Sequence, residues 1–292
     1  MKNLIVLLVI VALAAATPVT RQRASIQGRH GNLLQELEDV GCFTMVDLMI
    51  EAGFTGLLTG EEVYTIFSPE DTAFDQALID TLLADADLLT RFLNYHMTSG
   101  NVTLALFEND ATLTTLEGTT VRTNIYDSTY TVNGAAVTMP DEWADNGMVQ
   151  VINKVLFPIP VGAIPTVLAD DSEGRFTTLS MCIELSGLSG VLTGGPFTLF
   201  APTNAAFDAL PEGVLDALLS QPEGALKKVL LGHVAPTTIF ATGVTSGEVP
   251  SASDDNLVLN VGPDGVTVDA ANVIETDLVA TNGVIHVIDA VI

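Results

Sequence analysis

The sequence contains few of the residues that build covalent frameworks. Only two cysteines, Cys42 and Cys182, occur in 292 residues, and no Cys-x-x-Cys pair is present. A disulfide-rich scaffold is therefore excluded. In an oxidising compartment the two cysteines can form one disulfide, whereas in a packed interior they can remain free thiols. The sequence leaves both alternatives open.

Basic residues are equally scarce. The chain has 10 lysines and arginines against 36 aspartates and glutamates, which gives a formal net charge of −26. Nucleic acids and anionic membranes are polyanions, so this charge disfavours both as partners and favours cations or basic proteins. The acidic residues are dispersed along the chain, which is typical of a solvated surface.

Long apolar runs are absent after residue 16. Residues 1–16, MKNLIVLLVIVALAAA, combine an early lysine, an apolar stretch and an A-x-A ending, which predicts a secretory signal peptide. Residues 17–31 carry three arginines and are expected to form a basic, flexible tail. No later run approaches the roughly 18 apolar residues of a membrane-spanning helix. We therefore expect a secreted, extracellular protein without membrane insertion.

Signatures of catalysis and of metal binding are missing as well. The chain contains no G-x-S-x-G, H-E-x-x-H, Walker or EF-hand pattern. Its four histidines lie far apart in the sequence. The sequence therefore predicts a protein that is not an enzyme and that has no cofactor or resident metal.

One motif occurs twice in the chain. Residues 64–78, YTIFSPEDTAFDQAL, return as residues 197–210, FTLFAPTNAAFDAL, with five identities in the eleven-residue core. A period near 133 residues is too long for a solenoid unit. The repeat instead indicates two copies of a whole domain.

The motif predicts a strand, a sharp corner and a short helix. Its aromatic and β-branched start is typical of a buried strand, which ends at Pro202 because proline cannot donate to a sheet. Asn204 and its counterpart Asp71 are predicted to cap the helix that follows. Phe207 and Phe74 are predicted to enter the core. Because the motif has no nucleophile–base pair, it indicates a packing corner and not a catalytic site.

Both copies place helices first and strands last, which predicts an α+β fold. The first domain is expected at 32–157 and the second at 164–292, joined by a Pro-rich apolar linker at 158–163. Helices are predicted at 32–39, 44–52, 79–83, 87–96, 164–170, 177–185, 214–219 and 223–233. Strands are predicted at 112–116, 119–124, 129–132, 135–138, 148–157, 256–261, 266–269, 273–279 and 284–292.

Two positions differ between the copies in an informative way. The last helix before the strands ends in Tyr95-His96 in the first copy, whereas the second copy has Gly232 where the tyrosine would be. In the closing strand, His286 of the second copy corresponds to Gln150 of the first. An amide is a poor metal ligand, so this exchange predicts a hydrogen-bonded buried polar group and not a zinc or catalytic histidine.

The F-A-P-T-N-x-A-F corner, the Tyr-His element and the closing N-G-V-I-H-V-I-D strand together resemble the fasciclin (FAS1) domain. The resemblance occurs twice and covers residues 32–292. It implies that each domain is a helical layer packed on a twisted β-sandwich, or wedge. It also implies a role in extracellular adhesion, which is the usual function of the family.

The resemblance also suggests contact residues. In animal members an Asp-Ile pair before the closing strand, and the Tyr-His element, have been linked to integrin binding. Residues 275–283, ETDLVATNG, are similar to the first pattern, which suggests Asp277 and Leu278 as partner contacts. The first copy keeps Asp141 but follows it with glutamate. Tyr95 and His96 match the second pattern. A carboxylate beside an apolar side chain can complete a metal site of a receptor.

Asn101 begins the sequon Asn-Val-Thr and is a candidate glycosylation site. Two functions remain in competition. The first is adhesion, in which the protein binds a cell-surface receptor, a matrix protein or a glycan. The alternative is a charge-driven role, in which the dispersed acids bind Ca²⁺, a cationic surface or a mineral.

Overall fold

The computed structural model describes residues 31–157, 162–253, 255–263 and 265–292. The predicted signal peptide, nearly all of the basic tail and most of the predicted linker lie outside the described residues. Among the described residues, the structure contains no helix with the length and hydrophobicity that spanning a bilayer requires.

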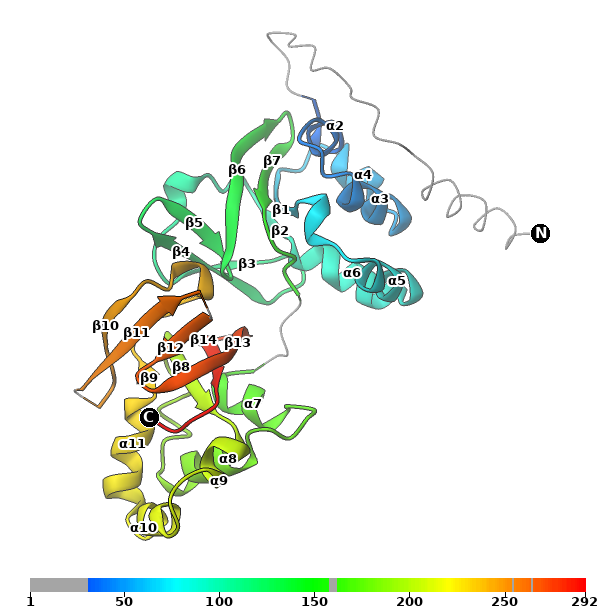
Figure 1. The fold of residues 1–292 in the computed structure, drawn as a ribbon. Helices are drawn as coiled ribbons and strands as arrows, with labels where there is room; N and C mark the ends of the chain where they lie inside the picture. Colours follow the sequence, from blue (N-terminus) through cyan, green and yellow to red (C-terminus); the bar gives the residue numbers. More distant parts are fainter. Residues whose placement is uncertain (1–30, 158–161, 254, 264) are drawn as a thin grey trace. The chain divides into compact units, whose positions relative to one another are not determined.

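The first repeat begins with helices and ends with strands, as predicted. Figure 1 shows its helices α2 to α6 gathered on one side of the strands. The helices are α2 (Leu33–Asp39), α3 (Phe43–Glu51), α4 (Thr55–Leu58), α5 (Gln76–Ala84) and α6 (Ala86–Tyr95), with short turns η1 (Asp71–Ala73) and η2 (Leu104–Leu106). The strands are β1 (Tyr64–Pro69), β2 (Met97–Ser99), β3 (Ala111–Thr114), β4 (Thr120–Tyr126), β5 (Thr129–Val132), β6 (Ala135–Ala144) and β7 (Gly147–Ile152).

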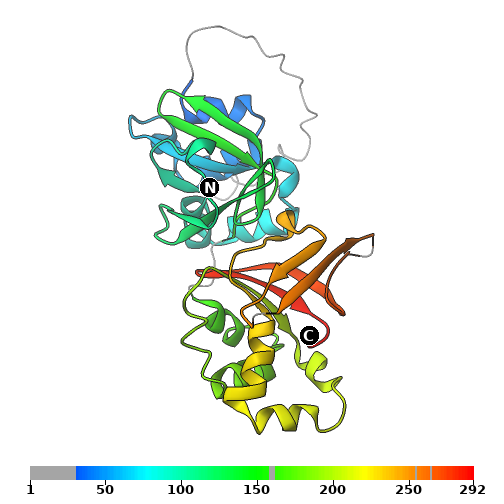
Figure 2. The same ribbon diagram turned by 90° about the vertical axis from the view of Figure 1, so that its left-hand side faces the viewer.

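The second repeat has the same plan. Figure 2 shows its helices and its strands separated into two layers. The helices are α7 (Ile164–Ala169), α8 (Thr177–Leu185), α9 (Asn204–Asp208), α10 (Val214–Leu219) and α11 (Lys227–Gly232), with turns η3 (Pro222–Leu226) and η4 (Ala241–Gly243). The strands are β8 (Phe197–Pro202), β9 (Val234–Ala235), β10 (Gly247–Pro250), β11 (Asn256–Gly262), β12 (Gly265–Val268), β13 (Ala271–Ala280) and β14 (Gly283–Ile288).

Each repeat contains one seven-stranded sheet with equivalent topology. The strand order is β2-β1-β7-β6-β5-β4-β3 in the first repeat and β9-β8-β14-β13-β12-β11-β10 in the second. The motif strand pairs in parallel with the closing strand, β1 with β7 and β8 with β14, and the other neighbours are antiparallel. The predicted α+β class is confirmed in both repeats.

The longest strand of each repeat extends beyond the pattern that predicted it. β6 runs to Ala144, six residues past the predicted end, and its pairing with β7 shifts register on both sides of Met139. Each shift is a bulge that interrupts the two-residue alternation, so the second half of the strand has no period-two signal. The short strands β2, β9 and β10 were also not predicted.

Each repeat buries two apolar clusters. One lies between the helices and the sheet and includes Met45, Phe92 and Val149 in the first repeat. The other lies within the strand layer and includes Phe67 and Val121. The second repeat has the equivalent pair of clusters. A sheet that is buried on two faces fits the wedge that the family resemblance implied.

The motif corner caps a different helix from the one predicted. Asn204 accepts a hydrogen bond from the backbone N–H of Thr178, at 3.0 Å, so it caps α8, which precedes it in the sequence. Asp71 caps α3 in the same way, through the N–H of Thr44 at 2.8 Å. The helix after Asn204 is capped by Thr203. Sequence proximity favoured the wrong helix, because the corner brings α8 and α3 back to the end of the strand.

Candidate functional site

Asp141 lies in the bulge of β6 and forms hydrogen bonds to η2 and to β7. It adopts a left-handed backbone conformation, with φ of 56°. Its Oδ1 accepts hydrogen bonds from the N–H of Leu104, at 3.0 Å, and from Nε2 of Gln150, at 2.7 Å. Aspartate is among the few residues that tolerate this conformation, because its short side chain can bond to nearby backbone groups. Asp141 therefore caps turn η2.

Gln150 completes this arrangement from the closing strand. Its Oε1 accepts from the backbone N–H of Asp141, at 2.9 Å, and its Nε2 also donates to the carbonyl of Val102, at 2.8 Å. The side chain is fully buried, and both ends of the amide are used. Gln150 is therefore the hydrogen-bonded, buried polar group that the sequence predicted for the closing strand of the first repeat.

Asp277 repeats the geometry of Asp141 in the bulge of β13. Its φ is 63°, and its Oδ1 accepts from the N–H of Ala241 at the start of η4, at 2.7 Å. The backbone N–H of Asp277 lies 3.3 Å from Nδ1 of His286, which occupies the place of Gln150. Nε2 of His286 is 2.7 Å from the carbonyl of Ile239.

These contacts define the state of His286. Nδ1 accepts a hydrogen bond from an N–H, so Nε2 must carry the proton and donate to the carbonyl of Ile239. Burial lowers the pKa of His286 below its usual value, which favours this neutral form. With both nitrogens engaged, the prediction of a satisfied core polar group is confirmed.

The second oxygen of Asp277 is also engaged. Oδ2 forms an ion pair with Nζ of Lys154, at 3.2 Å, and the Asp277 side chain keeps only 15% of its exposure. Leu278 is half-buried against the apolar cluster of the second repeat. The carboxylate thus has structural partners for both oxygens, and only a limited surface is left for a partner protein.

Tyr95 and His96 are completely buried. The hydroxyl of Tyr95 accepts from Nδ2 of Asn133, at 2.8 Å, and burial raises its pKa. Nε2 of His96 accepts from the N–H of Leu156, at 3.0 Å, so Nδ1 donates to the carbonyl of Phe92. This pair joins α6 to the end of the first repeat and offers no surface for a partner.

His233 makes the equivalent contacts in the second repeat. Its Nε2 accepts from the N–H of Ile292, at 3.0 Å, and its Nδ1 donates to the carbonyl of Val229, at 2.8 Å. Burial lowers the pKa of both His96 and His233 to about 4. The two histidines are neutral structural groups at neutral pH.

The remaining predicted residues lie apart from these contacts. Asn101 is exposed in the loop between β2 and η2. Cys42 and Cys182 are free and fully buried in the structure, each in the helix-side cluster of its own repeat. In the part of the chain that the structure describes, no group of three or more His, Cys, Asp or Glu side chains is placed to hold a metal ion.

The chain resembles known proteins along most of its length. It is 32% identical to the transforming growth factor-beta-induced protein ig-h3 of Sus scrofa over 251 residues, which are 85% of this chain and 36% of that protein. It is 46% identical to protein sll1483 of Synechocystis over 119 residues, which are 40% of this chain and 66% of that one. The chain therefore spans about a third of the length of the vertebrate relative.

A solved structure of a FAS1 domain pair from the insect cell adhesion molecule fasciclin I also aligns with the chain. The match has a TM-score of 0.41 and 19% sequence identity, and it covers 89% of this chain and 95% of that one. The model of the fasciclin domain matches residues 40–158 and again residues 174–292. Both repeats are covered, and the chain belongs to the fasciclin domain family.

Proposed function

We propose that this protein is a secreted, non-catalytic adhesion or matrix protein that binds a cell-surface receptor, a matrix protein or a glycan. The observation that carries the proposal is the match of both repeats to the fasciclin domain. The family resemblance implies extracellular adhesion as the usual role of such domains. The predicted signal peptide at residues 1–16 supports secretion. Asn101 is exposed in its loop, and we propose that it is glycosylated if the protein passes through a eukaryotic secretory pathway.

Within this proposal, Asp277 and Leu278 form the contact to be tested first, and Asp141 is its counterpart in the first repeat. The availability of the Asp277 carboxylate depends on Lys154, because the ion pair occupies Oδ2. Lys154 is itself about half exposed, so exchange of this pair for a stronger external partner has a modest cost. Tyr95 and His96 are not carried into the proposal, since both are buried.

The test is an adhesion assay on the mature protein coated on a surface, with cells from its source, across a salt series. Asp277→Asn removes the charge but keeps an oxygen that can accept from the N–H of Ala241, so the fold of the bulge is preserved. Lys154→Ala frees Oδ2 without altering Asp277. We expect adhesion to fall in the first variant and to rise in the second, with little dependence on salt.

Asp141→Asn is the matched control, because it makes the same change in the bulge of the first repeat. Adhesion that is equal in all four proteins would rule out the Asp277 contact while leaving adhesion itself intact. A wild-type surface to which no cells attach would contradict the adhesion function.

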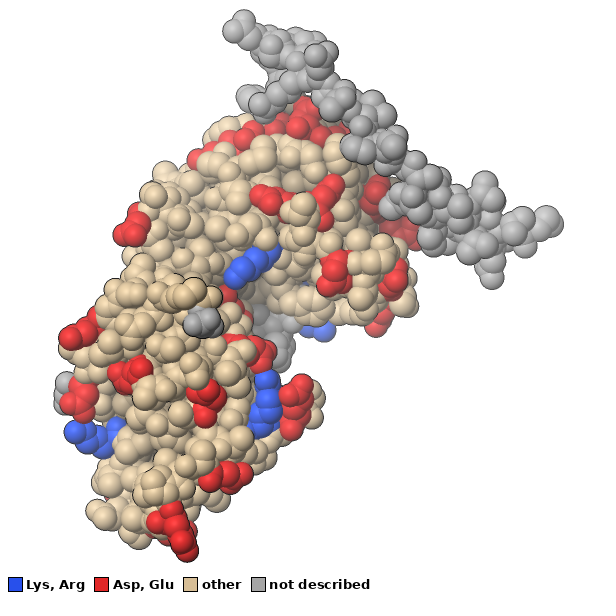
Figure 3. All heavy atoms as spheres, viewed as in Figure 1, with Lys and Arg blue, Asp and Glu red and all other residues tan. Residues whose placement is uncertain are grey.

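A second candidate function rests on the charge. All 36 acidic residues but only six of the ten basic residues lie in residues 31–292. Of those six, Arg91, Lys154, Arg175 and Lys228 are already paired with carboxylates. Figure 3 shows acidic side chains scattered over the visible face with few basic ones among them. Binding of Ca²⁺ or of a cationic surface would then be diffuse, and it would fade steeply with salt in every variant.

A further inference from the structure

The two repeats differ at the end of the helix that precedes the buried histidines His96 and His233. In the first repeat the ring of Tyr95 belongs to the apolar cluster of the strand layer. Its hydroxyl group lies 2.8 Å from Nδ2 of Asn133 and 3.4 Å from the carbonyl of Thr120. The tyrosine thus fills a space between α6, the start of β4 and the turn after β5.

In the second repeat this position is Gly232, and the space is open. The equivalence follows from the histidines, because His96 and His233 directly follow Tyr95 and Gly232 and make matching hydrogen bonds. A Cβ placed on Gly232 would meet only Oγ of Ser253, at 3.7 Å, which is an ordinary van der Waals distance. The backbone of this glycine therefore has room for a side chain.

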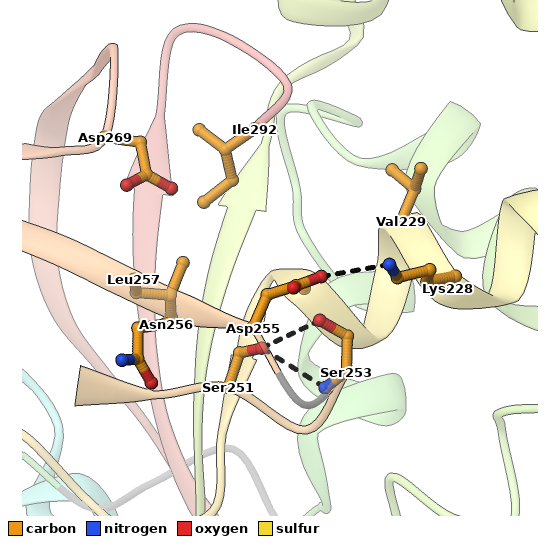
Figure 4. A pocket seen from close by; sticks show the side chains of 10 residues that line it. Lys228, Val229, Ser251, Ser253, Asp255, Asn256, Leu257, Asp269 and Ile292 are labelled. Atoms are coloured by element: carbon orange, nitrogen blue, oxygen red, sulfur yellow. Dashed lines mark hydrogen bonds and ion pairs between the residues drawn. The ribbon is translucent and has the colours of Figure 1, made fainter. Parts of the chain in front are cut away.

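A hollow of about 310 Å³ is found at this place. Figure 4 shows Asp269, Leu257 and Ile292 on one side of it and Val229 and Lys228 of α11 on the other. Val229, Leu257 and Ile292 supply apolar walls. The rim is polar: Lys228 pairs with Asp255 at 3.1 Å, and the hydroxyl groups of Ser251 and Ser253 are 2.9 Å apart.

The polar end of the hollow corresponds to the group that holds the tyrosine hydroxyl in the first repeat. Asn133 and Asp269 both have a left-handed backbone, with φ of 46° and 48°. Oδ1 of Asn133 accepts from the N–H of Arg122, and Oδ1 of Asp269 accepts from the equivalent N–H of Val258. The free end of Asn133 bonds to the phenol of Tyr95, and the free end of Asp269 is the other carboxylate oxygen, on an exposed side chain that lines the hollow.

We propose that the hollow beside Gly232 is a binding site for a phenolic group, such as a tyrosine side chain of a partner or a free phenol. The ring takes the place that Tyr95 fills in the first repeat, between Val229, Leu257 and Ile292. Its hydroxyl donates to the carboxylate of Asp269, and a hydrogen bond to a charged acceptor is stronger than a neutral one. The inference is independent of the adhesion proposal, because it concerns direct binding of a small ligand.

The first experiment titrates the wild-type mature protein with p-cresol and follows backbone amide chemical shifts by NMR. We expect saturable, millimolar binding, with shifts confined to α11, residues 251–253 and 255–257, and the turn at Asp269. 4-Methylanisole has the same ring but no hydroxyl donor, and we expect it to bind about tenfold or more weakly. N-acetyl-tyrosine amide and its phenylalanine analogue repeat the comparison for a peptide side chain and distinguish the two sources of the phenol.

Variants at Gly232 provide the second experiment. Gly232→Tyr is expected to fill the hollow and abolish p-cresol binding, whereas Gly232→Ala, the matched control, is expected to retain it within about twofold, since its Cβ makes only the one ordinary contact. The absence of saturable shifts around Gly232 in the wild type, or equal affinity for p-cresol and 4-methylanisole, would overturn the proposal. Undiminished binding by a folded Gly232→Tyr protein would do so as well. The ligand comparison on the wild type decides the question if this variant does not fold.

Discussion

The two repeats make equivalent internal hydrogen bonds with different side chains. In the closing strand, the bulge aspartate is held by an amide in the first repeat, Gln150, and by an imidazole in the second, His286. Both groups accept from the N–H of the aspartate and donate to a backbone carbonyl. Holding the bulge aspartate therefore requires a side chain with one acceptor and one donor in the right places, and either an amide or an imidazole can supply them. At another position, where Gly232 replaces Tyr95, the second repeat has a hollow in place of the side chain.

The largest effect is expected where both repeats share a close backbone approach. A Cβ on Gly147 would collide with the carbonyl oxygen of Tyr64, and one on Gly283 with that of Phe197. These carbonyl oxygens belong to the strands that pair in parallel in each sheet, where the hydrogen-bonded backbone resists displacement. Gly147→Ala and Gly283→Ala should each lower the free energy of unfolding by more than about 4 kcal/mol, as measured in urea. Gly190→Ala, with no atom within 4 Å, is the control and should have little effect. A mild effect at either shared glycine would show that its sheet can relax there.

The next largest effect is expected when the side chain of Tyr95, which has no counterpart at Gly232, is removed. Tyr95→Gly would create in the first repeat the hollow that the second repeat already has, at a cost of about 3–5 kcal/mol, because a large buried ring and its hydrogen bond are lost. Tyr95→Phe keeps the ring and should cost only about 1 kcal/mol. Denaturant unfolding of the two variants measures the contribution of the ring and that of the hydroxyl group to the free energy of unfolding. Similar stability of both variants would mean that the ring contributes little and that the hydroxyl dominates.

Acid should destabilise both repeats, and the second one more. The pKa of His96 and of His233 falls from 6.5 to about 4 on folding, so the unfolded chain binds more protons between these values. Stability from each histidine is fully present above pH 6.5 and is lost as the pH falls to 4, an effect of about 3 kcal/mol per histidine. His286 adds to this loss in the second repeat, whereas Gln150 does not titrate.

Hydrogen exchange of each repeat, measured between pH 7 and pH 4, tests this difference. His286→Gln copies the first repeat, so it should remove the additional acid sensitivity of the second. If the two repeats lose protection in parallel in the wild type, His286 is not a significant contributor.

The smallest effect is expected at Lys154. Lys154→Ala removes an ion pair in which the lysine is 48% exposed, so the free energy of unfolding should change by less than about 1 kcal/mol, and less still in high salt. Thermal unfolding in low and high salt measures the difference. A larger, salt-independent loss would show that Lys154 stabilises the protein through packing of its aliphatic part.

Much of the fold could be predicted because it is recorded in local patterns. The repeated corner indicated two domains, and helices such as α8 and strands such as β5 were located by their periodicity. The exchange of Gln150 for His286 was sufficient to predict a structural polar group. The helix capped by Asn204 was predicted wrongly, because a capping side chain can reach a helix that lies nearby only in the folded protein.

The surroundings of the candidate contact residues could not be predicted from the sequence, because they too depend on segments that meet only in the folded protein. Burial of Tyr95 and His96 and the ion pair between Asp277 and Lys154 depend on residues far away in the sequence. The sequence did show that Gly232 lacks the tyrosine of its counterpart. It could not show that the neighbouring chain leaves the space empty, with Asp269 at its end.

Repeats, periodicity and charge are properties of the amino-acid sequence, and they were sufficient to predict the two-domain organisation, the α+β class, the acidic character and the family of this protein. The folded structure was needed to show which polar side chains are hydrogen-bonded inside the protein and which remain available to a partner. Hydrogen-bond partners and open space arise where distant segments meet, and their positions are set by packing of the whole domain.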